Sequence, residues 1–286
     1  MEERNERGET LKEFLARYDE TQYRRPSNTV DMILLTVLKG KLKVLLVKRK
    51  DHPFIHDWAM PGGFVNFDED LDTAMKRELE EETNLFDSTY FRQLYTFGNA
   101  DRDPRTRVIT TVYLSMTPAE NIKMTSAGDD AMDTGWFTIQ KITTTTDGYE
   151  RKSVLMLDEE EKGIHLRYEI YDTACDNYVQ TRSKLLDSSN AKLAADHIKA
   201  INMAIDVVRN RAASTGIMFN LLPKECTLRE IQEVYEAIVN HPVDTGNFRR
   251  DIKKMLVATG NTTIVNGRKV ATYSFNPLLP FVKETL

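Results

Sequence analysis

Four glutamates and one arginine fall within six consecutive residues, Arg77 to Glu82, and could act together chemically. At about 100° per helical residue, Glu78, Glu81 and Glu82 share one side of a helix. Like charges three and four residues apart destabilise a helix unless a positive charge lies between them. Oxygen ligands of this kind suit Mg²⁺ or Mn²⁺, whereas Arg77, four residues before Glu81, could hold that carboxylate. The spacing therefore indicates a divalent metal site, although an isolated run of glutamates is more often a solvated helix face.

The surrounding sequence predicts the elements that position this cluster. Leu71 to Thr83 has helical spacing, and Asp70 is placed to cap its start. The glycine pair Gly62-Gly63 precedes the helix and would let the backbone approach a metal ion or phosphate closely. Strands are expected over residues 32–38, 42–48, 107–115 and 136–139, which gives a mixed α/β domain in about the first 140 residues.

The order of residues from Gly63 to Leu85 resembles the Nudix box, G-x5-E-x7-R-E-U-x-E-E-x-G-U, where U is apolar. Every charged position matches, and Asn84 stands where the family has glycine. Asn is the best substitute for glycine at a left-handed helix end. The resemblance implies an α/β/α sandwich that uses a divalent metal to cleave a nucleoside diphosphate linked to another group. The catalytic residues it implies are Glu69, Arg77, Glu78, Glu81 and Glu82, with the metal on Glu78, Glu81, Glu82 and a carbonyl near Gly62.

The box does not identify a general base. Asp129 and Asp130 are candidates, but a polar turn accounts for them equally well. The candidates for ligand contacts are Gly63, Phe97, Arg102, Arg105 and Arg107, since the arginine fork can pair two phosphate oxygens at once. The arginines could instead be ordinary surface charges. We interpret His52, His56 and His197 as structural, because their spacing supports no metal site.

The C-terminal end is basic, although the chain has a net charge of −5. Between Thr245 and Lys283 there are seven basic residues and a single acidic one, which favours an anionic partner. Two amphipathic helices are expected here, one stopped at Asn240 and one ended at Gly260, before the hairpin signal Asn266-Gly267. This order is that of a winged helix-turn-helix. A solvated helix face would also be basic, but we expect DNA contacts from Asn247, Arg249, Arg250, Lys253, Lys254, Arg268 and Lys269.

As a whole, the chain resembles the Nudix-related transcriptional regulators of bacterial NAD metabolism, the NrtR-like family. The segments that carry this resemblance, besides the box, include Trp58–Phe64, Phe219–Pro223 and Asn247–Arg250. It implies an α/β Nudix sandwich that senses ADP-ribose and a small C-terminal winged helix-turn-helix that binds a double-stranded DNA operator. We expect a homodimer.

Three parts are expected along the chain. The first is a Nudix domain over residues 1–190, with an insertion at about 141–192 that is longer than the resemblance predicts. In this insertion the β-prone residues 154–157 and 165–171 indicate an extra hairpin. A linking or dimerising helix follows within 191–221, where Leu193 to Arg211 has helical spacing. The winged helix-turn-helix occupies 222–286.

Composition excludes several classes of protein. Hydrophobic residues make up 41% of the chain and charged residues 29%, which suits a folded core. The most apolar stretch, residues 32–38, is too short to span a membrane, and the first residues do not form a secretory signal. Cys175 and Cys226 lack zinc-like spacing, so we interpret them as free thiols in a reducing cytoplasm.

Two functions of different classes fit these features. The first is a DNA-binding repressor of NAD metabolism genes that responds to ADP-ribose and keeps the capacity to hydrolyse it. The alternative is a dedicated Nudix pyrophosphohydrolase, similar to ADP-ribose pyrophosphatases, whose C-terminal module only dimerises. Mg²⁺ or Mn²⁺ is the expected cofactor in both.

Overall fold

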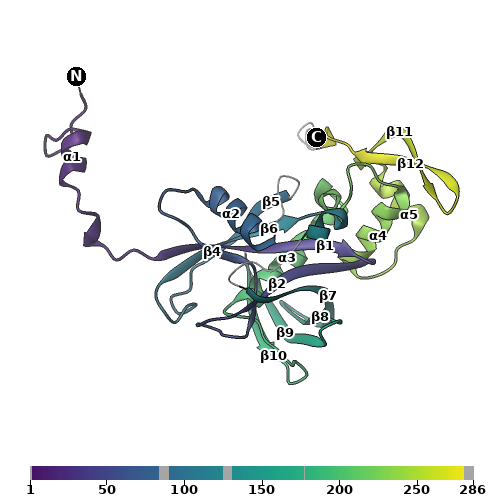
Figure 1. Ribbon diagram of the computed structural model, residues 1–286, viewed down its shortest axis with the longest axis horizontal. Coiled ribbons are helices and arrows are strands. Elements are labelled where there is room, and N and C mark those ends of the chain that lie inside the picture. The colour runs from purple at the N-terminus through teal and green to yellow at the C-terminus, as the bar shows by residue number, and fades with distance from the viewer. Residues whose placement is uncertain (1, 84–89, 125–130, 177, 280–286) are drawn as a thin grey trace.

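The computed structural model describes residues 2–83, 90–124, 131–176 and 178–279 (Figure 1). The helices are α1 (Leu11–Arg17), α2 (Leu71–Thr83), α3 (His197–Ala212), α4 (Leu228–Val239) and α5 (Thr245–Ile252). Short 3₁₀ helices cover Glu20–Gln22, Ala119–Met124, Gly216–Leu221 and Lys253–Met255. The strands are β1 (Ser27–Leu38), β2 (Lys41–Arg49), β3 (Trp58–Ala59), β4 (Gly62–Phe64), β5 (Tyr90–Phe97), β6 (Val108–Met116), β7 (Ala131–Asp147), β8 (Glu150–Glu159), β9 (Ile164–Cys175), β10 (Tyr178–Leu185), β11 (Leu256–Val265) and β12 (Arg268–Phe275).

The large sheet has the strand order β10-β9-β8-β7-β2-β1-β6-β5 and is mixed, because β1 runs parallel to β6 while its other pairs are antiparallel. β1 and β2 form the expected hairpin, closed by the two residues Lys39 and Gly40, both with positive φ. Away from this turn, β4 pairs with β1 and β3 pairs with β2. The two long strands therefore separate at that end, with β3 and β4 beside them.

Successive side chains of the central strands point to opposite faces of the sheet, and this divides the core into two layers. Val30, Met32 and Leu34 pack with α2 on one face of the sheet, whereas Ile33 and Leu35 belong to the cluster on the other face, which includes α3. Asp70 caps α2 as expected, accepting a hydrogen bond from the Thr73 backbone N–H at 2.8 Å. The predicted α/β/α sandwich is confirmed.

Helix α3 supplies the second α layer. Its apolar side chains, including Ile201, Ile205 and Val208, are buried against the sheet and α4 within the same chain. The apolar stripe of this helix is therefore covered within the chain, and its role in linking or dimerisation stays a prediction. The helix does connect the sheet domain to the C-terminal helices in sequence (Figure 1).

Residues 141–192 continue the main sheet. The polar run Thr143–Thr146 lies within β7, which extends well beyond the predicted Trp136–Ile139, and β8, β9 and β10 follow as an antiparallel meander. The hairpin expected here is thus an extension of the same sheet, since each strand pairs with the one before it. Lys141 in β7 donates to Asp206 of α3 at 2.7 Å, so this extension also contacts the second helical layer.

The C-terminal domain has the order α4, α5, β11, β12 of a winged helix-turn-helix. Asn240 ends α4 in the left-handed conformation, and Asn266-Gly267 forms the tight turn between β11 and β12, as expected. The second helix is shorter than predicted: α5 stops at Ile252, a 3₁₀ turn reaches Met255, and Leu256 begins β11. Gly260 lies at an irregularity of β11 instead of ending a helix, because the chain must already reverse into the wing.

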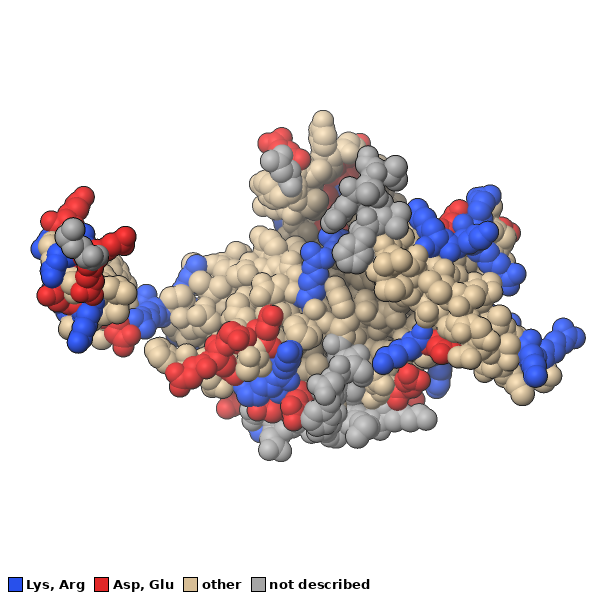
Figure 2. All heavy atoms as spheres, turned by 90° about the horizontal axis from the view of Figure 1, so that it is seen from above, with Lys and Arg blue, Asp and Glu red and all other residues tan. Residues whose placement is uncertain are grey.

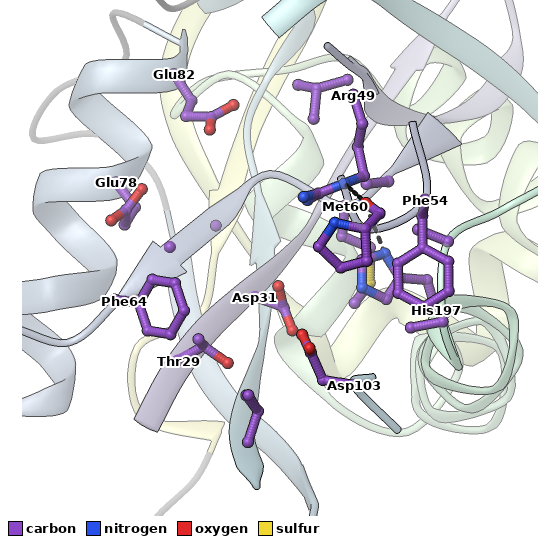
Figure 3. A pocket seen from close by; sticks show the side chains of 18 of the residues that line it. Thr29, Asp31, Arg49, Phe54, Met60, Phe64, Glu78, Glu82, Asp103 and His197 are labelled. Atoms are coloured by element: carbon purple, nitrogen blue, oxygen red, sulfur yellow. Dashed lines mark hydrogen bonds between the residues drawn. The ribbon is translucent and has the colours of Figure 1, made fainter. Parts of the chain in front are cut away.

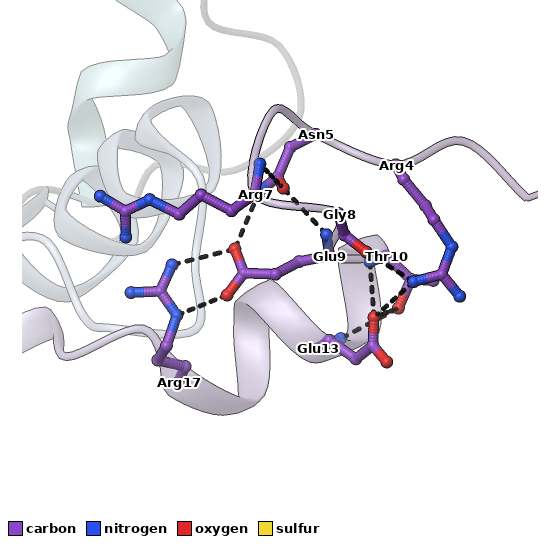
Figure 4. Close-up of polar contacts among 8 residues, drawn as sticks. All are labelled: Arg4, Asn5, Arg7, Gly8, Glu9, Thr10, Glu13 and Arg17. Carbon is purple, nitrogen blue, oxygen red and sulfur yellow. Dashed lines mark hydrogen bonds and ion pairs between the residues drawn. The ribbon is translucent and has the colours of Figure 1, made fainter.

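The N-terminal arm leaves the body and carries α1 at its far end (Figure 1). Polar contacts hold the arm together, including a two-bond ion pair from Arg17 to Glu9 and a capping box at Thr10 (Figure 4). Leu11, Leu15 and Tyr18 remain exposed on α1. None of the helices described by the structure is long and apolar enough to cross a membrane.

Candidate functional site

A pocket of about 530 Å³ lies where β1 and β2 separate (Figure 3). Its walls come from both strands, the β3–β4 segment, α2, the loop after β5 and the start of α3. Glu78 and Glu82 of α2 lie on one side, whereas Arg49, Phe54 and His197 lie across from them. The expected acidic helix thus faces a cavity large enough for a small ligand.

Glu78, Glu81 and Glu82 of α2 form the acidic wall of the pocket, and Arg77 holds two of these carboxylates in place. Its guanidinium contacts Glu69 at 2.7 Å, Glu78 at 2.7 Å and Glu81 at 3.1 Å, and donates to the carbonyl of Phe64. The Arg77 hydrogen bonds, helped by the Asn66 backbone N–H, lower the pKa of Glu69 to about 2. Burial raises the pKa of Glu78 despite the same arginine. Glu69, Glu78 and Glu81 therefore lie together around the Arg77 guanidinium.

Close contacts surround both glycines before α2, with backbone at Gly62 and with a side chain at Gly63. A Cβ on Gly62 would lie 2.2 Å from the Val30 carbonyl oxygen, and its φ of +151° is also unfavourable for other residues. A Cβ on Gly63 would lie 2.2 Å from a carboxylate oxygen of Glu78. Both residues line the pocket, so this backbone lies beside the acidic helix, and its close approach to a metal ion or phosphate stays a prediction.

The opposite wall contains a buried ion pair. Arg102, whose side chain is 6% exposed, contacts Asp196 at 3.0 Å and Asp31 at 3.7 Å. His197 accepts a hydrogen bond from the Met60 backbone N–H at 2.9 Å through Nδ1. Burial lowers the pKa of His197, which favours the neutral ring that this contact needs. The structural interpretation of His197 agrees with this contact.

The structure brings together only some of the predicted ligand residues. Gly63, Arg102 and Arg105 line the pocket, and Arg105 is held by Asp103 and lies 5.6 Å from the centre of the Phe64 ring. Phe97 packs against the core and Tyr95, and Arg107 is exposed on the approach to β6; neither lines the pocket. Asn84, Leu85, Asp129 and Asp130 lie outside the described residues.

Several lining residues were not predicted, including Asp31, Arg49, Phe54 and Phe64. Asp196, which lies between two lining residues and contacts Arg102, was not predicted either. They come from segments far apart in sequence, and each is an ordinary residue within its own segment. Asp31 could have been recognised from the sequence, because a carboxylate within an apolar strand is unusual and often has a functional role. In the structure it accepts a hydrogen bond from the Thr110 hydroxyl at 2.6 Å.

The donor chemistry of the acidic wall suits a hard divalent cation, because Glu78, Glu81 and Glu82 all line the pocket. Within the described ranges, however, no three acidic, histidine or cysteine side chains are gathered as a metal site. Glu69, Glu78 and Glu81 are instead drawn onto Arg77. The glutamates of the acidic wall are therefore suitable metal ligands by residue type, but in this structure the Arg77 guanidinium lies between the carboxylates.

The second candidate site is the basic surface of the C-terminal domain, which comprises Asn247, Arg249, Arg250, Lys253, Lys254, Arg268 and Lys269. All seven side chains are exposed, whereas Phe248 and Ile252 of α5 are buried. Lys and Arg side chains gather at this end of the molecule, opposite the N-terminal arm (Figure 2). Arg250 has a weak exposed contact with Asp251 at 3.4 Å.

Comparison with known proteins assigns both parts. Residues 26–157 match the NUDIX domain family, and residues 218–275 match the NrtR DNA-binding winged helix domain family. The chain is 28% identical to the ADPR responsive transcriptional repressor NtrR of Acinetobacter baylyi, over 92% of this chain and 87% of that protein. It is 33% identical to the ADP-ribose pyrophosphatase of Methanocaldococcus jannaschii, over 49% of this chain and 80% of that protein.

Among solved structures, the chain resembles Shewanella oneidensis NrtR complexed with a 27mer DNA. The TM-score is 0.59 at 26% identity, over 88% of this chain and 94% of that one. The likeness therefore extends over most of both chains. The chain belongs to the Nudix family, and its C-terminal end matches the NrtR DNA-binding winged helix domain.

Proposed function

We propose that this protein is a DNA-binding transcriptional regulator that responds to ADP-ribose. The observation that carries the proposal is that one chain holds both a Nudix pocket and an exposed basic surface on a winged helix. The repressor of Acinetobacter baylyi, similar over 92% of this chain, is named for its response to ADP-ribose. The relative from Shewanella oneidensis was crystallised with DNA.

In this proposal the basic surface binds a double-stranded operator. Exposed cations on α5 and the wing suit phosphate contacts, and Asn247 and Arg250 can hydrogen-bond to base edges. NAD metabolism genes are the regulated genes implied by the family resemblance. The pocket receives ADP-ribose, whose diphosphate suits the arginines at its rim and whose planar base suits Phe64 or Phe54.

A gel-shift titration tests both halves. The probe is a duplex taken from the region upstream of the protein's own gene, and it is titrated with the full chain with and without ADP-ribose. We expect binding that weakens as salt rises and that changes when ADP-ribose is added. Binding that ignores ADP-ribose would remove the effector half of the proposal.

We further propose that the acidic wall holds Mg²⁺ or Mn²⁺ on Glu78, Glu81 and Glu82, with backbone near Gly62. When bound, the metal would neutralise diphosphate oxygens and activate water. The chain's own residues support this site: Arg77 and Glu69 orient the helix, and Gly62 and Gly63 admit the ligand. The test is hydrolysis of ADP-ribose, NAD and related dinucleotides with each metal, with and without DNA.

A dedicated Nudix pyrophosphohydrolase is the second candidate. It is favoured by the full set of box glutamates and by the likeness of residues in the Nudix part to an ADP-ribose pyrophosphatase. Rapid turnover together with no DNA binding at low salt would favour this alternative, in which the C-terminal module only dimerises.

The homodimer and the cytoplasmic location remain predictions. The exposed apolar residues of α1, Leu11, Leu15 and Tyr18, are an observation that favours self-association. Sedimentation equilibrium of the full chain measures its mass directly, and a single species of monomer mass at micromolar concentration would contradict the dimer.

A further inference from the structure

The start of α3 forms part of the pocket wall, so a ligand in the pocket can contact this helix or its partners. Ala195 and His197 line the pocket, and Asp196 between them holds Arg102, another lining residue. The same helix ends against the DNA-binding domain. We propose that Asp196 is the residue through which occupancy of the pocket acts on the winged helix, by competing with an anionic ligand for Arg102.

The competition follows from the charges at this point. Arg102 is nearly buried and meets two carboxylates, Asp196 at 3.0 Å and Asp31 at 3.7 Å. A diphosphate that enters the pocket offers Arg102 a more highly charged partner with the same two-oxygen geometry. When Arg102 turns to the ligand, Asp196 loses its partner.

Asp196 has a second partner available in the chain. It occupies the N-cap position of α3 but makes no side-chain capping bond there, because its carboxylate is directed to Arg102. Aspartate is among the best N-cap residues, and the positive end of the helix favours its charge. The carboxylate therefore has two alternative positions, on Arg102 or on the first turn of α3.

The backbone beside Asp196 is held in a strained conformation. Ala195 has a φ of +44°, which is unusual for a residue with a Cβ. The preceding segment is fixed to the sheet, since Ala194 N–H donates to the Trp58 carbonyl at 2.8 Å. Strain at the junction between a fixed segment and a helix is relieved if the helix start moves.

The far end of α3 contacts the first helix of the winged domain. Arg209 donates through Nε to the carbonyl of Ile238, in the last turn of α4, at 2.9 Å. Ile201 and Ile205 of α3 share a core cluster with Ile231 and Ile238 of α4. Tyr235 of α4 then packs on Phe248 of α5, with ring centres 5.1 Å apart. A rigid helix with packed ends transmits a displacement at Asp196 to the basic surface.

The proposal rests on the proposed function, and one set of titrations tests the two separately. The affinity of the full chain for the upstream duplex is measured with and without ADP-ribose, without added divalent metal so that turnover does not deplete the ligand. The affinity for ADP-ribose is measured with and without the duplex, because coupling must be equal in both directions. Asp196→Asn is compared with Asp101→Asn, which removes the same charge from an exposed position next to Arg102.

In the wild type, and in Asp101→Asn, we expect ADP-ribose to change DNA affinity by about 5–150-fold. In Asp196→Asn the change should fall to about twofold or less, with DNA affinity fixed at the value of the ligand-bound wild type. ADP-ribose should still bind Asp196→Asn, because Arg102 is released toward the pocket. If Asp196→Asn does not fold, the same titrations are carried out with Asp196→Ser, because serine is also a favourable N-cap residue.

The distal contact gives a second test. Arg209→Lys keeps the charge but loses the fixed fork, so ADP-ribose affinity without DNA should be unchanged while the coupling factor falls. Full coupling in Asp196→Asn would overturn this inference and leave the proposed function standing, whatever Arg209→Lys shows. A wild type that binds DNA but ignores ADP-ribose would overturn both.

Discussion

The pocket and the basic surface use charge in opposite ways. In the pocket wall, Arg102 is 6% exposed and lies between two aspartates, and Arg77 is shared by three glutamates. On the C-terminal surface, Arg249, Lys253 and Lys254 are exposed, and the described part of the chain gives them no carboxylate partner within 4.0 Å. One region holds its charges in pairs, and the other presents them to solvent.

This difference determines how each region should respond to change. Buried paired charges depend on geometry, so removing one partner leaves the other uncompensated. Exposed cations depend on their number and are screened by salt, so each contributes a separate part of DNA affinity. Substitutions in the pocket should therefore act on ligand chemistry, on stability and, through Asp196, on the response of DNA binding to the ligand. Those on the surface should act on DNA binding alone.

The largest effect is expected for Glu82→Gln, which keeps size and polarity but removes one charge from the proposed metal site. Hydrolysis of ADP-ribose with Mg²⁺ should fall by about 100-fold or more, while the fold survives because repulsion along α2 is reduced. Steady-state turnover of the purified variant measures this, with Glu80→Gln, on the opposite side of α2, as the control. Unchanged turnover would show that α2 is not the catalytic helix.

Gly62→Ala tests the geometric precision of the pocket wall. The added Cβ would lie 2.2 Å from the Val30 carbonyl, so we expect a loss of about 1–3 kcal/mol in unfolding free energy. Urea denaturation measures the loss. Gly98→Ala is the matched control, since its Cβ would meet only ordinary contacts with Ile109 at 3.9 Å. Equal stability of the two variants would show that this backbone is not tightly packed.

Arg250→Ala tests the independence of the basic surface. Its operator affinity should fall by about 1–3 kcal/mol if Arg250 binds guanine through two hydrogen bonds. If Arg250 contacts only phosphate, the loss should be similar for all sequences and the salt slope should fall by about one. Gel-shift titrations over a salt series separate the two cases.

Two measurements control the Arg250→Ala result. Arg182→Ala, an exposed arginine on β10, should leave operator affinity unchanged. ADP-ribose binding should be the same in wild type and Arg250→Ala. Loss of ADP-ribose binding in Arg250→Ala would contradict the separation of the two sites.

The smallest expected effect concerns pH and His197. Because burial lowers the pKa of His197 below 6.5, the unfolded chain binds more protons than the folded chain as the medium becomes acidic. The contribution of His197 to stability is thus complete above pH 6.5 and is lost as pH falls toward the lowered pKa. Each unit of lowering corresponds to about 1.4 kcal/mol.

Urea denaturation between pH 7.5 and about 5.5 measures this effect against the ordinary histidine pKa. The pH dependence should be weaker in His197→Gln, which does not titrate. His52→Gln, at an exposed position, should retain the dependence of the wild type. A steeper slope in His197→Gln than in the wild type would contradict a neutral buried ring.

Much of the fold could be predicted because it depends on local patterns. Alternation in β1, helical spacing with Asp70 at its start in α2, and Asn266-Gly267 in the wing each involve residues close in sequence. Helix α5 was predicted too long because its pattern continues through Met255 and Leu256, although these residues turn into β11. The strands between 150 and 185 were only partly predicted, since their pairing depends on partners far along the chain.

The sequence by itself determined the acidic helix and the basic surface. Within α2 and α5 the residues are neighbours in the chain, so helical periodicity decides which of them share a face, and the Asn266-Gly267 turn places Arg268 and Lys269 in the wing. Only the tertiary structure decided that Asp31, Arg102 and Asp196 would meet, that Arg107 and Phe97 would not line the pocket, and that α3 would cover the sheet. These contacts join segments up to 165 residues apart, from Asp31 to Asp196, and no local spacing specifies them.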